Sequence, residues 1–122
     1  MKKILVVDDE RDTVRLTKKI LEDEDFDVIP SYDGNEALDI IEQKYSDIDL
    51  ILLDIMMPKK SGFSVLEDLK NDERFKKIPV ICFTIKNFNE DIQKAKRLGA
   101  CGYLVKPFSG NQLITYVNSK LR

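Results

Sequence analysis

The chain has 122 residues, of which 43% are hydrophobic and 34% charged, a composition typical of one globular domain with a single core. Its net charge is −2, so the overall charge gives no reason to expect a direct nucleic-acid partner. Histidine is absent, which excludes Ser-His-Asp and Cys-His catalysis and most zinc sites. We expect a single domain over residues 1–122.

The first predicted element lies in "KKILVVDDE", where an apolar run at residues 4–7 ends at Asp8 and Asp9. This run is too short for a signal peptide or a membrane-spanning helix. We therefore predict a cytoplasmic protein with no membrane partner. A helix of about 10–24 follows, with Thr13, Leu16 and Ile20 along one side as its apolar stripe.

Two more strands, at residues 28–29 and 50–53, are predicted from short apolar runs. The helix between them is expected to begin with a capping box formed by Asp33 and Glu36. Another helix follows the run at 50–53, because Val65, Leu66 and Leu69 recur at helical spacing.

A fourth strand at residues 80–83 precedes the most polar helix, at 90–98, whose start is marked by Asn87 and Glu90. A fifth strand at 103–105 precedes the last helix, whose start is marked by Ser109 and Gln112 and whose apolar stripe is Leu113, Ile114, Val117 and Leu121. The two cysteines, Cys82 and Cys101, show no metal-ligand spacing and are predicted to be buried free thiols. Apolar strands separated by helices predict an α/β, doubly wound fold with a parallel sheet covered on both faces.

Polar residues follow four of the predicted strands. They are Asp8 and Asp9 after the first, Asp54 after the third, Thr84 after the fourth and Lys106 after the fifth. Each alone has an ordinary structural explanation, such as a helix cap or a solvated amine. In an open α/β sheet, however, the carboxyl ends of the strands form the ligand-binding edge. We expect these side chains to meet there.

Three carboxylates in one place repel each other unless a cation is present. Oxygen ligands suit a hard divalent ion, so we predict a Mg²⁺ site at Asp8, Asp9 and Asp54. Asp54 lies between a buried strand and a loop, and it is the carboxylate best placed to attack phosphorus and form an aspartyl phosphate. Lys106 would balance the phosphoryl charge.

The motifs "VVDDE", "LLDIMMP" with "SG" after it, "FT" and "YLVKPF" resemble those of the receiver domain of two-component response regulators, including the chemotaxis regulators. The resemblance runs from the first strand to the last helix. It implies the flavodoxin-like strand order 2-1-3-4-5 and a phosphorelay signalling switch rather than an enzyme that turns over a metabolite. It also implies Mg²⁺, or Mn²⁺ in its place, as the cofactor.

By this resemblance Asp54 is the phosphoacceptor, and it contributes to the metal site. Asp9 is a direct metal ligand, Asp8 a ligand through water, and the backbone carbonyl of Met56 a further ligand. Thr84 supplies the switch hydroxyl of the family.

Lys106 is expected to pair with the phosphoryl group, and the Lys106–Pro107 peptide bond is expected to be cis. The aromatic side chain of Tyr103 would swing inward as the Thr84 hydroxyl moves. The surface formed by the helix at 90–98, the strand at 103–105 and the last helix would then carry the output.

Two residues depart from the usual family pattern. Ile85 stands where a small residue is common, so we expect slower phosphorylation by small donors. Met56 has only a thioether, a weak acceptor for a hydrolytic water, so we expect a long-lived phosphoryl group. Lys86 is a third residue that could influence the phosphorylation site, and the sequence does not indicate whether it would speed or slow the reaction.

The resemblance implies a sensor histidine kinase or phosphotransfer protein as phosphoryl donor. The output would pass to another protein, to an effector domain outside this chain, or to a phosphorylation-dependent dimer through the output surface. Two alternatives stay open. One is a degenerate receiver that binds a partner without phosphorylation. The other, a phosphatase of the haloacid-dehalogenase type, lacks the acid/base residue expected at position 56.

Overall fold

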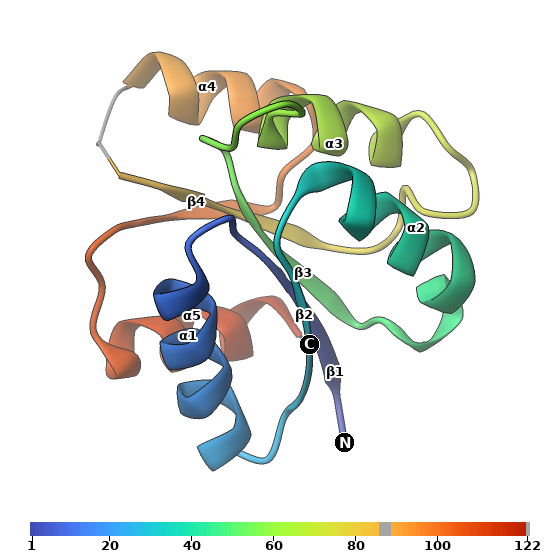
Figure 1. The fold of residues 1–122 in the computed structure, drawn as a ribbon. Helices are drawn as coiled ribbons and strands as arrows, with labels where there is room; N and C mark the ends of the chain where they lie inside the picture. Colours follow the sequence, from blue (N-terminus) through green and yellow to red (C-terminus); the bar gives the residue numbers. More distant parts are fainter. Residues whose placement is uncertain (86–88, 122) are drawn as a thin grey trace.

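The computed structural model describes residues 1–85 and 89–121, with the backbone alone at Thr84. Strands and helices alternate along the chain (Figure 1). The strands are β1 (Lys3–Val7), β2 (Asp27–Ser31), β3 (Leu50–Asp54), β4 (Val80–Thr84) and β5 (Gly102–Val105). The helices are α1 (Arg11–Asp23), α2 (Gly34–Lys44), the short 3₁₀ helix η1 (Tyr45–Asp47), α3 (Gly62–Lys70), α4 (Asn89–Arg97) and α5 (Gly110–Lys120).

The strands form one parallel sheet in the order β2-β1-β3-β4-β5. This confirms the predicted fold class and strand order. The register places Val7 beside Leu53, and Asp54 beside Phe83. The carboxyl ends of the central strands therefore lie side by side, and the residues that follow them share one edge of the sheet.

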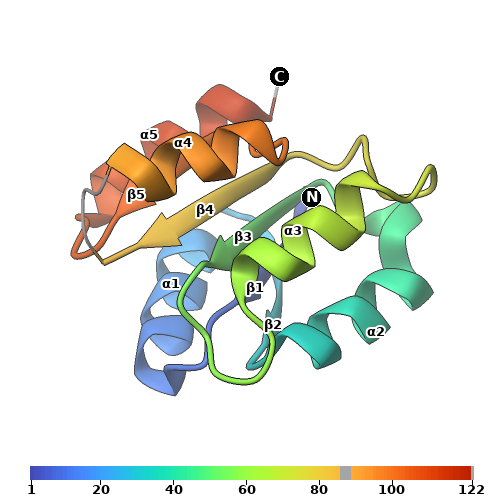
Figure 2. The ribbon, with the colours of Figure 1, turned by 90° about the horizontal axis from the view of Figure 1, so that it is seen from above.

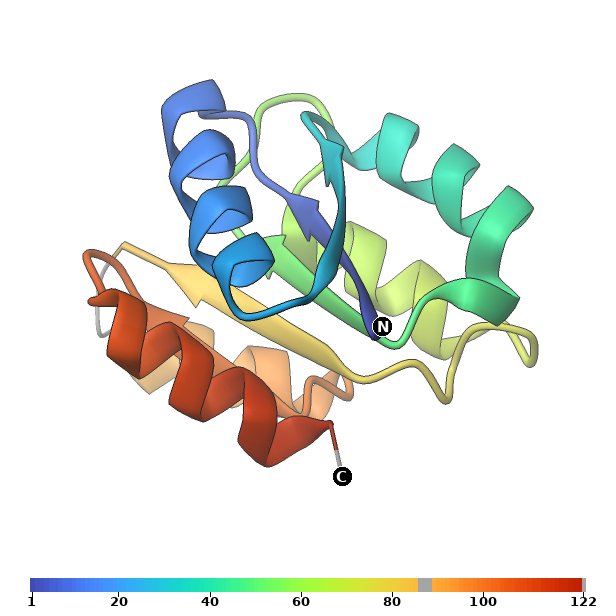
Figure 3. The same cartoon turned by 90° about the horizontal axis from the view of Figure 1, so that it is seen from below.

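Helices cover both faces of the sheet, as Figures 2 and 3 show from opposite sides. α2, α3 and α4 pack on one face around Ile41, Leu66 and Ala95. α1 and α5 pack on the other face around Leu21 and Val117. The strand residues Leu50–Leu53 are fully buried between these layers, which explains their uninterrupted apolar sequence. None of the helices in the described ranges is long and apolar enough to cross a membrane.

The predicted helix starts agree with the structure where they are described. The Asp33 side chain accepts a hydrogen bond from the Glu36 N–H at 2.8 Å, although the Glu36 carboxylate accepts from Tyr32 rather than from Asp33. Ser109 and Gln112 form a complete capping box at α5. The predicted Asn87 cap lies outside the described residues.

Two predictions about burial were wrong. The buried stripe of α1 is Val14, Thr17 and Leu21, whereas Leu16 is 61% exposed. Cys82 is a buried free thiol as predicted, but Cys101 is exposed, because it precedes the edge strand β5 and pairs with β4 only through its backbone N–H.

Candidate functional site

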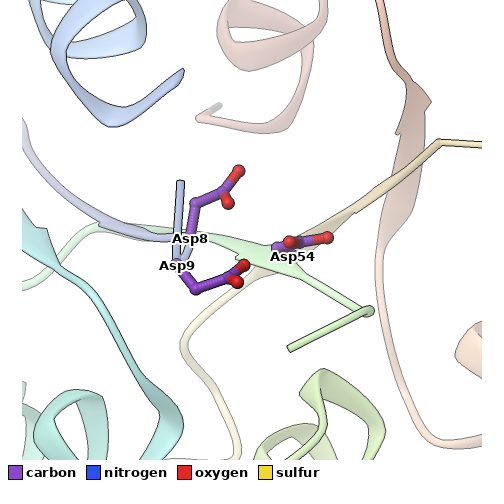
Figure 4. Close-up of side chains that lie close together, drawn as sticks. All are labelled: Asp8, Asp9 and Asp54. Atoms are coloured by element: carbon purple, nitrogen blue, oxygen red, sulfur yellow. The ribbon is translucent and has the colours of Figure 1, made fainter. Parts of the chain in front are cut away.

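Three carboxylates meet at the carboxyl edge of the sheet (Figure 4). Asp8 and Asp9 follow β1, and Asp54 is the last residue of β3. One oxygen from each of the three lies within 4.8 Å of the others. Asp8 is 0% exposed and Asp54 is 2% exposed, whereas Asp9 faces solvent. The predicted convergence of these three residues therefore occurs in the structure.

Lys106 supplies the cation nearest to this cluster. Its Nζ donates to an Asp8 oxygen at 2.5 Å and lies 3.7 Å from Asp54 and 3.8 Å from Glu10. The amine is also 5.8 Å from the centroid of the Phe83 ring, near the carboxyl end of β4. The Lys106–Pro107 peptide bond is cis, the configuration that the resemblance implies.

Burial controls the electrostatics of Asp54. The pKa of Asp54 is raised from its ordinary value of 3.8 to about 7, and desolvation by burial is the largest cause. The charge of Asp8 acts in the same direction, whereas the charge of Lys106 and the hydrogen bond from the Met56 N–H act in the opposite one. The charge of Lys106 therefore does not offset the burial of the Asp54 carboxylate beside the carboxylate of Asp8.

The loop after β3 is held close to Asp54. The Oδ1 atom of Asp54 accepts a hydrogen bond from the Met56 N–H at 3.2 Å. The Gly62 N–H donates to the Ile55 carbonyl at 2.9 Å. A Cβ atom at Gly62 would lie 2.2 Å from the Asp54 carbonyl oxygen. Only glycine allows the start of α3 to approach the phosphoacceptor candidate this closely.

The other predicted site residues lie around the cluster at different distances. Thr84 ends β4 beside Val105 of β5, but its side chain is outside the described part of the structure, as is the whole of Lys86. Met56 is 63% exposed and Ile85 is 54% exposed. The ring of Tyr103 lies 5.9 Å from the Lys96 amine of α4.

The donor set fits a divalent cation. Three carboxylates, two of them buried, face a single lysine among the described residues, so the cluster has excess negative charge in a place where water is largely excluded. All three donors are carboxylate oxygens, the ligands that Mg²⁺ and Mn²⁺ prefer and that zinc sites seldom use alone.

A groove that the sequence does not predict lies beside this cluster. It has a volume of about 420 Å³ and lies between α1 and the segment after β5; its lining includes Leu16, Ile85, Lys106, Pro107 and Phe108. Leu16 is the signal that could have revealed this groove. It is an apolar residue of α1 that lies at the border of the helix's buried stripe and not within it. Glu10 and Gly62 are two further site residues: they lie in the motifs "VVDDE" and "SG", but the sequence alone assigns neither of them a role in the site.

Comparison with known proteins identifies the family. The model of the response regulator receiver domain matches residues 4–118. The chain belongs to this family. Receiver domains of this kind are signalling domains of two-component systems, and Mg²⁺ and an aspartyl phosphate are standard for them.

Individual relatives agree with this assignment. The transcriptional regulatory protein CpxR of Escherichia coli (strain K12) is 42% identical over the full 122 residues of this receiver domain, which match 50% of its own length. The chain thus spans about half the length of the curated relatives it matches. The solved chemotaxis protein CheY4 of Vibrio cholerae has a TM-score of 0.93 at 30% identity, and 99% of each chain is covered. The receiver domain of the Francisella response regulator 1452 has a TM-score of 0.90 at 32% identity, covering 99% of this receiver domain and 97% of that one.

Proposed function

We propose that this receiver domain is a phosphorylation-dependent switch in which Asp54 accepts a phosphoryl group from a phosphohistidine donor. The donor would be a sensor histidine kinase or a phosphotransfer protein. Residues 1–122 would act as one domain in the cytoplasm, which modifies itself and turns over no free metabolite.

The observation that supports this proposal most strongly is the setting of Asp54. Its carboxylate ends a fully buried strand, lies 3.7 Å from the Lys106 amine and shares one small space with Asp8 and Asp9. A burial that raises its pKa also leaves its charge poorly solvated. A poorly solvated carboxylate is a better nucleophile than one surrounded by water.

Phosphoryl transfer to Asp54 requires positioning more than acid or base chemistry. An Asp54 oxygen forms the bond to phosphorus while the phosphorus–nitrogen bond of the phosphohistidine breaks, and the imidazole nitrogen keeps the electron pair. Lys106 would shift from Asp8 toward the added phosphoryl oxygens, and the Thr84 hydroxyl would donate to one of them. Loss of the group needs water to attack phosphorus, which regenerates the Asp54 carboxylate and free phosphate.

The metal in this proposal would be held by Asp8, Asp9, Asp54 and the backbone carbonyl of Met56. Mg²⁺, or Mn²⁺ in its place, supplies positive charge that neutralises the phosphoryl oxygens during transfer. The residues of the chain hold the reacting groups in place: the Met56 N–H fixes one oxygen of Asp54, and the Glu10 N–H fixes one oxygen of Asp8 at 3.0 Å.

The signal would leave through α4, β5 and α5. Tyr103 connects these elements, because it lies on β5 between the Lys96 amine of α4 and the Tyr116 hydroxyl of α5. An inward movement of the Tyr103 ring, coupled to Thr84, would change this surface. An output protein, an effector domain beyond this chain, or a second copy would read that change.

The experiment that tests the proposal is phosphorylation by a small donor. Radiolabelled acetyl phosphate should label the wild-type protein in millimolar Mg²⁺ and fail to label it in excess EDTA. Asp54→Asn should remove the label, whereas Asp39→Asn, a matched change at an exposed acid of α2, should not. Equal labelling of wild type and Asp54→Asn would refute the assignment.

The labelling experiment also distinguishes the proposed switch from a degenerate receiver and from a phosphatase. A degenerate receiver would take up no label under any condition. A phosphatase would release phosphate from a monoester such as p-nitrophenyl phosphate continuously, whereas the proposed switch releases phosphate only from its own Asp54.

A further inference from the structure

The three methionines of the chain differ in their exposure to solvent. Met1 is 90% exposed and Met56 is 63% exposed, whereas Met57 is 8% exposed and belongs to the core beneath α2, α3 and α4. Met1 precedes β1, at the end of that strand opposite to Asp8. Of these three residues, all of which lie in the described ranges, Met56 alone is both open to solvent and next to the phosphoacceptor candidate.

The backbone holds Met56 beside Asp54. The N–H of Met56 donates to Oδ1 of Asp54 at 3.2 Å, so the two residues are joined by a hydrogen bond as well as by the chain. The methionine side chain is unbranched and rotates about three bonds, and its sulfur can therefore sample the solvent beside the carboxylate. A thioether is a weak hydrogen-bond acceptor, so Met56 in its reduced form does little to hold a water there.

The two thiols of the chain are poor competitors for an oxidant. Burial raises the pKa of the Cys82 thiol to about 12, and desolvation raises the pKa of Cys101 as well. The thiolate is the form of cysteine that oxidants attack, and both cysteines hold little of it at neutral pH. A thioether has no proton to lose, so the sulfur of an exposed methionine reacts without this handicap.

We propose that Met56 is an oxidation site through which a peroxide shortens the lifetime of a phosphoryl group on Asp54. A lone pair of the Met56 sulfur attacks one oxygen of hydrogen peroxide, so that a sulfur–oxygen bond forms while the oxygen–oxygen bond breaks. The released hydroxide takes the proton of the transferred hydroxyl, which leaves methionine sulfoxide and water. Sulfur is oxidised by two electrons and the peroxide is reduced by two. Methionine sulfoxide reductases reverse this change.

Oxidation changes the hydrogen bonding beside Asp54. A sulfoxide is polar, and its oxygen accepts hydrogen bonds that a thioether sulfur does not hold. The sulfoxide oxygen of Met56 would accept from a water that attacks phosphorus. The bond between phosphorus and the Asp54 oxygen then breaks, Asp54 keeps the electron pair, and the proton that the water loses passes to a phosphate oxygen. This inference rests on the proposed function and adds a regulator to it, because the peroxide would end the signal.

The test compares the loss of label before and after oxidation. Protein treated with millimolar hydrogen peroxide is freed of the peroxide, mapped by peptide mass spectrometry and labelled with radiolabelled acetyl phosphate in Mg²⁺. We expect sulfoxide at Met56 to about the same extent as at Met1, and little at Met57. The phosphoryl half-life should shorten about fivefold, which corresponds to one hydrogen bond of about 1 kcal/mol. Treatment with methionine sulfoxide reductases should restore the original half-life.

Two variants isolate the contribution of Met56. Met56→Leu keeps an apolar side chain but has no sulfur, so its half-life should not respond to peroxide although Met1 is still oxidised. Cys101→Ser removes the exposed thiol and should respond to peroxide as the wild type does. Urea unfolding of the oxidised wild type should match that of the reduced protein, because the side chain that changes faces solvent.

Several outcomes would overturn the inference. These are a Met56 that stays reduced while Met1 is oxidised, and a half-life that is unchanged or longer after oxidation. The same acceleration in Met56→Leu, or its absence in Cys101→Ser, would assign the effect to another residue, and a parallel loss of stability would assign it to partial unfolding. Untreated protein that takes up no label would refute the proposed function itself. Label that is lost equally fast with and without Met56 oxidation would refute this inference alone.

Discussion

Replacing Asp54 by asparagine is expected to stabilise the metal-free protein. The charged carboxylate is disfavoured in the fold because burial raises its pKa from 3.8 to about 7, and each pKa unit corresponds to about 1.4 kcal/mol. The full penalty is therefore on the order of 4 kcal/mol, which water entry and relaxation of the site reduce. Asparagine has nearly the same shape and can still accept from the Met56 N–H. We expect Asp54→Asn to raise the free energy of unfolding by about 1–3 kcal/mol at pH 8.

The gain in stability from Asp54→Asn should increase as the pH rises. Because the pKa of Asp54 is higher in the folded than in the unfolded chain, the folded state binds more protons between pH 4 and pH 7. The contribution of Asp54 to stability therefore falls as the pH rises through this range, and its penalty is complete above pH 7. Below about pH 3 the carboxyl is neutral in both states, so the advantage of Asp54→Asn should be small at pH 4 and vanish below that.

Urea unfolding followed by circular dichroism in EDTA, at pH values from 4 to 8, measures this directly. Asp39→Asn provides the control, because it removes one exposed acid of α2 and should leave the curve almost unchanged. Millimolar Mg²⁺ should stabilise the wild type more than Asp54→Asn, and so narrow the gap. A variant no more stable than the wild type at pH 8, or a gain that stays constant from pH 4 to pH 8, would refute this account of the buried charge.

Three other variants test the surroundings of Asp54. Ile85→Ala should speed labelling by acetyl phosphate about threefold, because it removes an exposed branched side chain beside Lys106; equal rates would remove any role of Ile85 in access. Met56→Asn should shorten the phosphoryl half-life several-fold, since an amide can hold a water that a thioether cannot, and an unchanged half-life measured by loss of radiolabel would contradict this. Gly62→Ala should lower the free energy of unfolding by about 2–3 kcal/mol, because its Cβ would meet the Asp54 carbonyl oxygen. Gly110→Ala, where the nearest atom lies at 3.6 Å, should cost far less, and a similar loss in both would show that the contact at Gly62 is unimportant.

The fold could be predicted because its signals are local. The central strands β1 and β3 are short apolar runs that are buried on both faces, and this pattern needs no knowledge of distant contacts. The strand order came from the resemblance, not from the residues. The stripe of α1 was misassigned because Leu16 is apolar yet borders the groove near Lys106, and helical spacing alone does not decide which of two adjacent stripes faces the sheet.

The residues that form the site could be predicted from the sequence, but the contacts between them could not. The ends of parallel strands share one edge, so the convergence of Asp8, Asp9 and Asp54 follows from their positions in the sequence. No sequence pattern indicates that Lys106 contacts Asp8 at 2.5 Å and Asp54 only at 3.7 Å, because that choice depends on side-chain packing. The close approach of Gly62 to Asp54 is likewise a tertiary contact, invisible in the sequence itself.

The measurement that tests the central claim most directly is the chemical location of the phosphoryl group. The protein is incubated with Mg²⁺ and a phosphohistidine-bearing donor, reduced with borohydride, which converts an aspartyl phosphate to homoserine, and digested for peptide mass spectrometry. We predict homoserine at Asp54 and at no other aspartate, with none formed when EDTA replaces Mg²⁺. Homoserine at Asp8 or Asp9, or at no residue of the wild-type chain, would contradict the account.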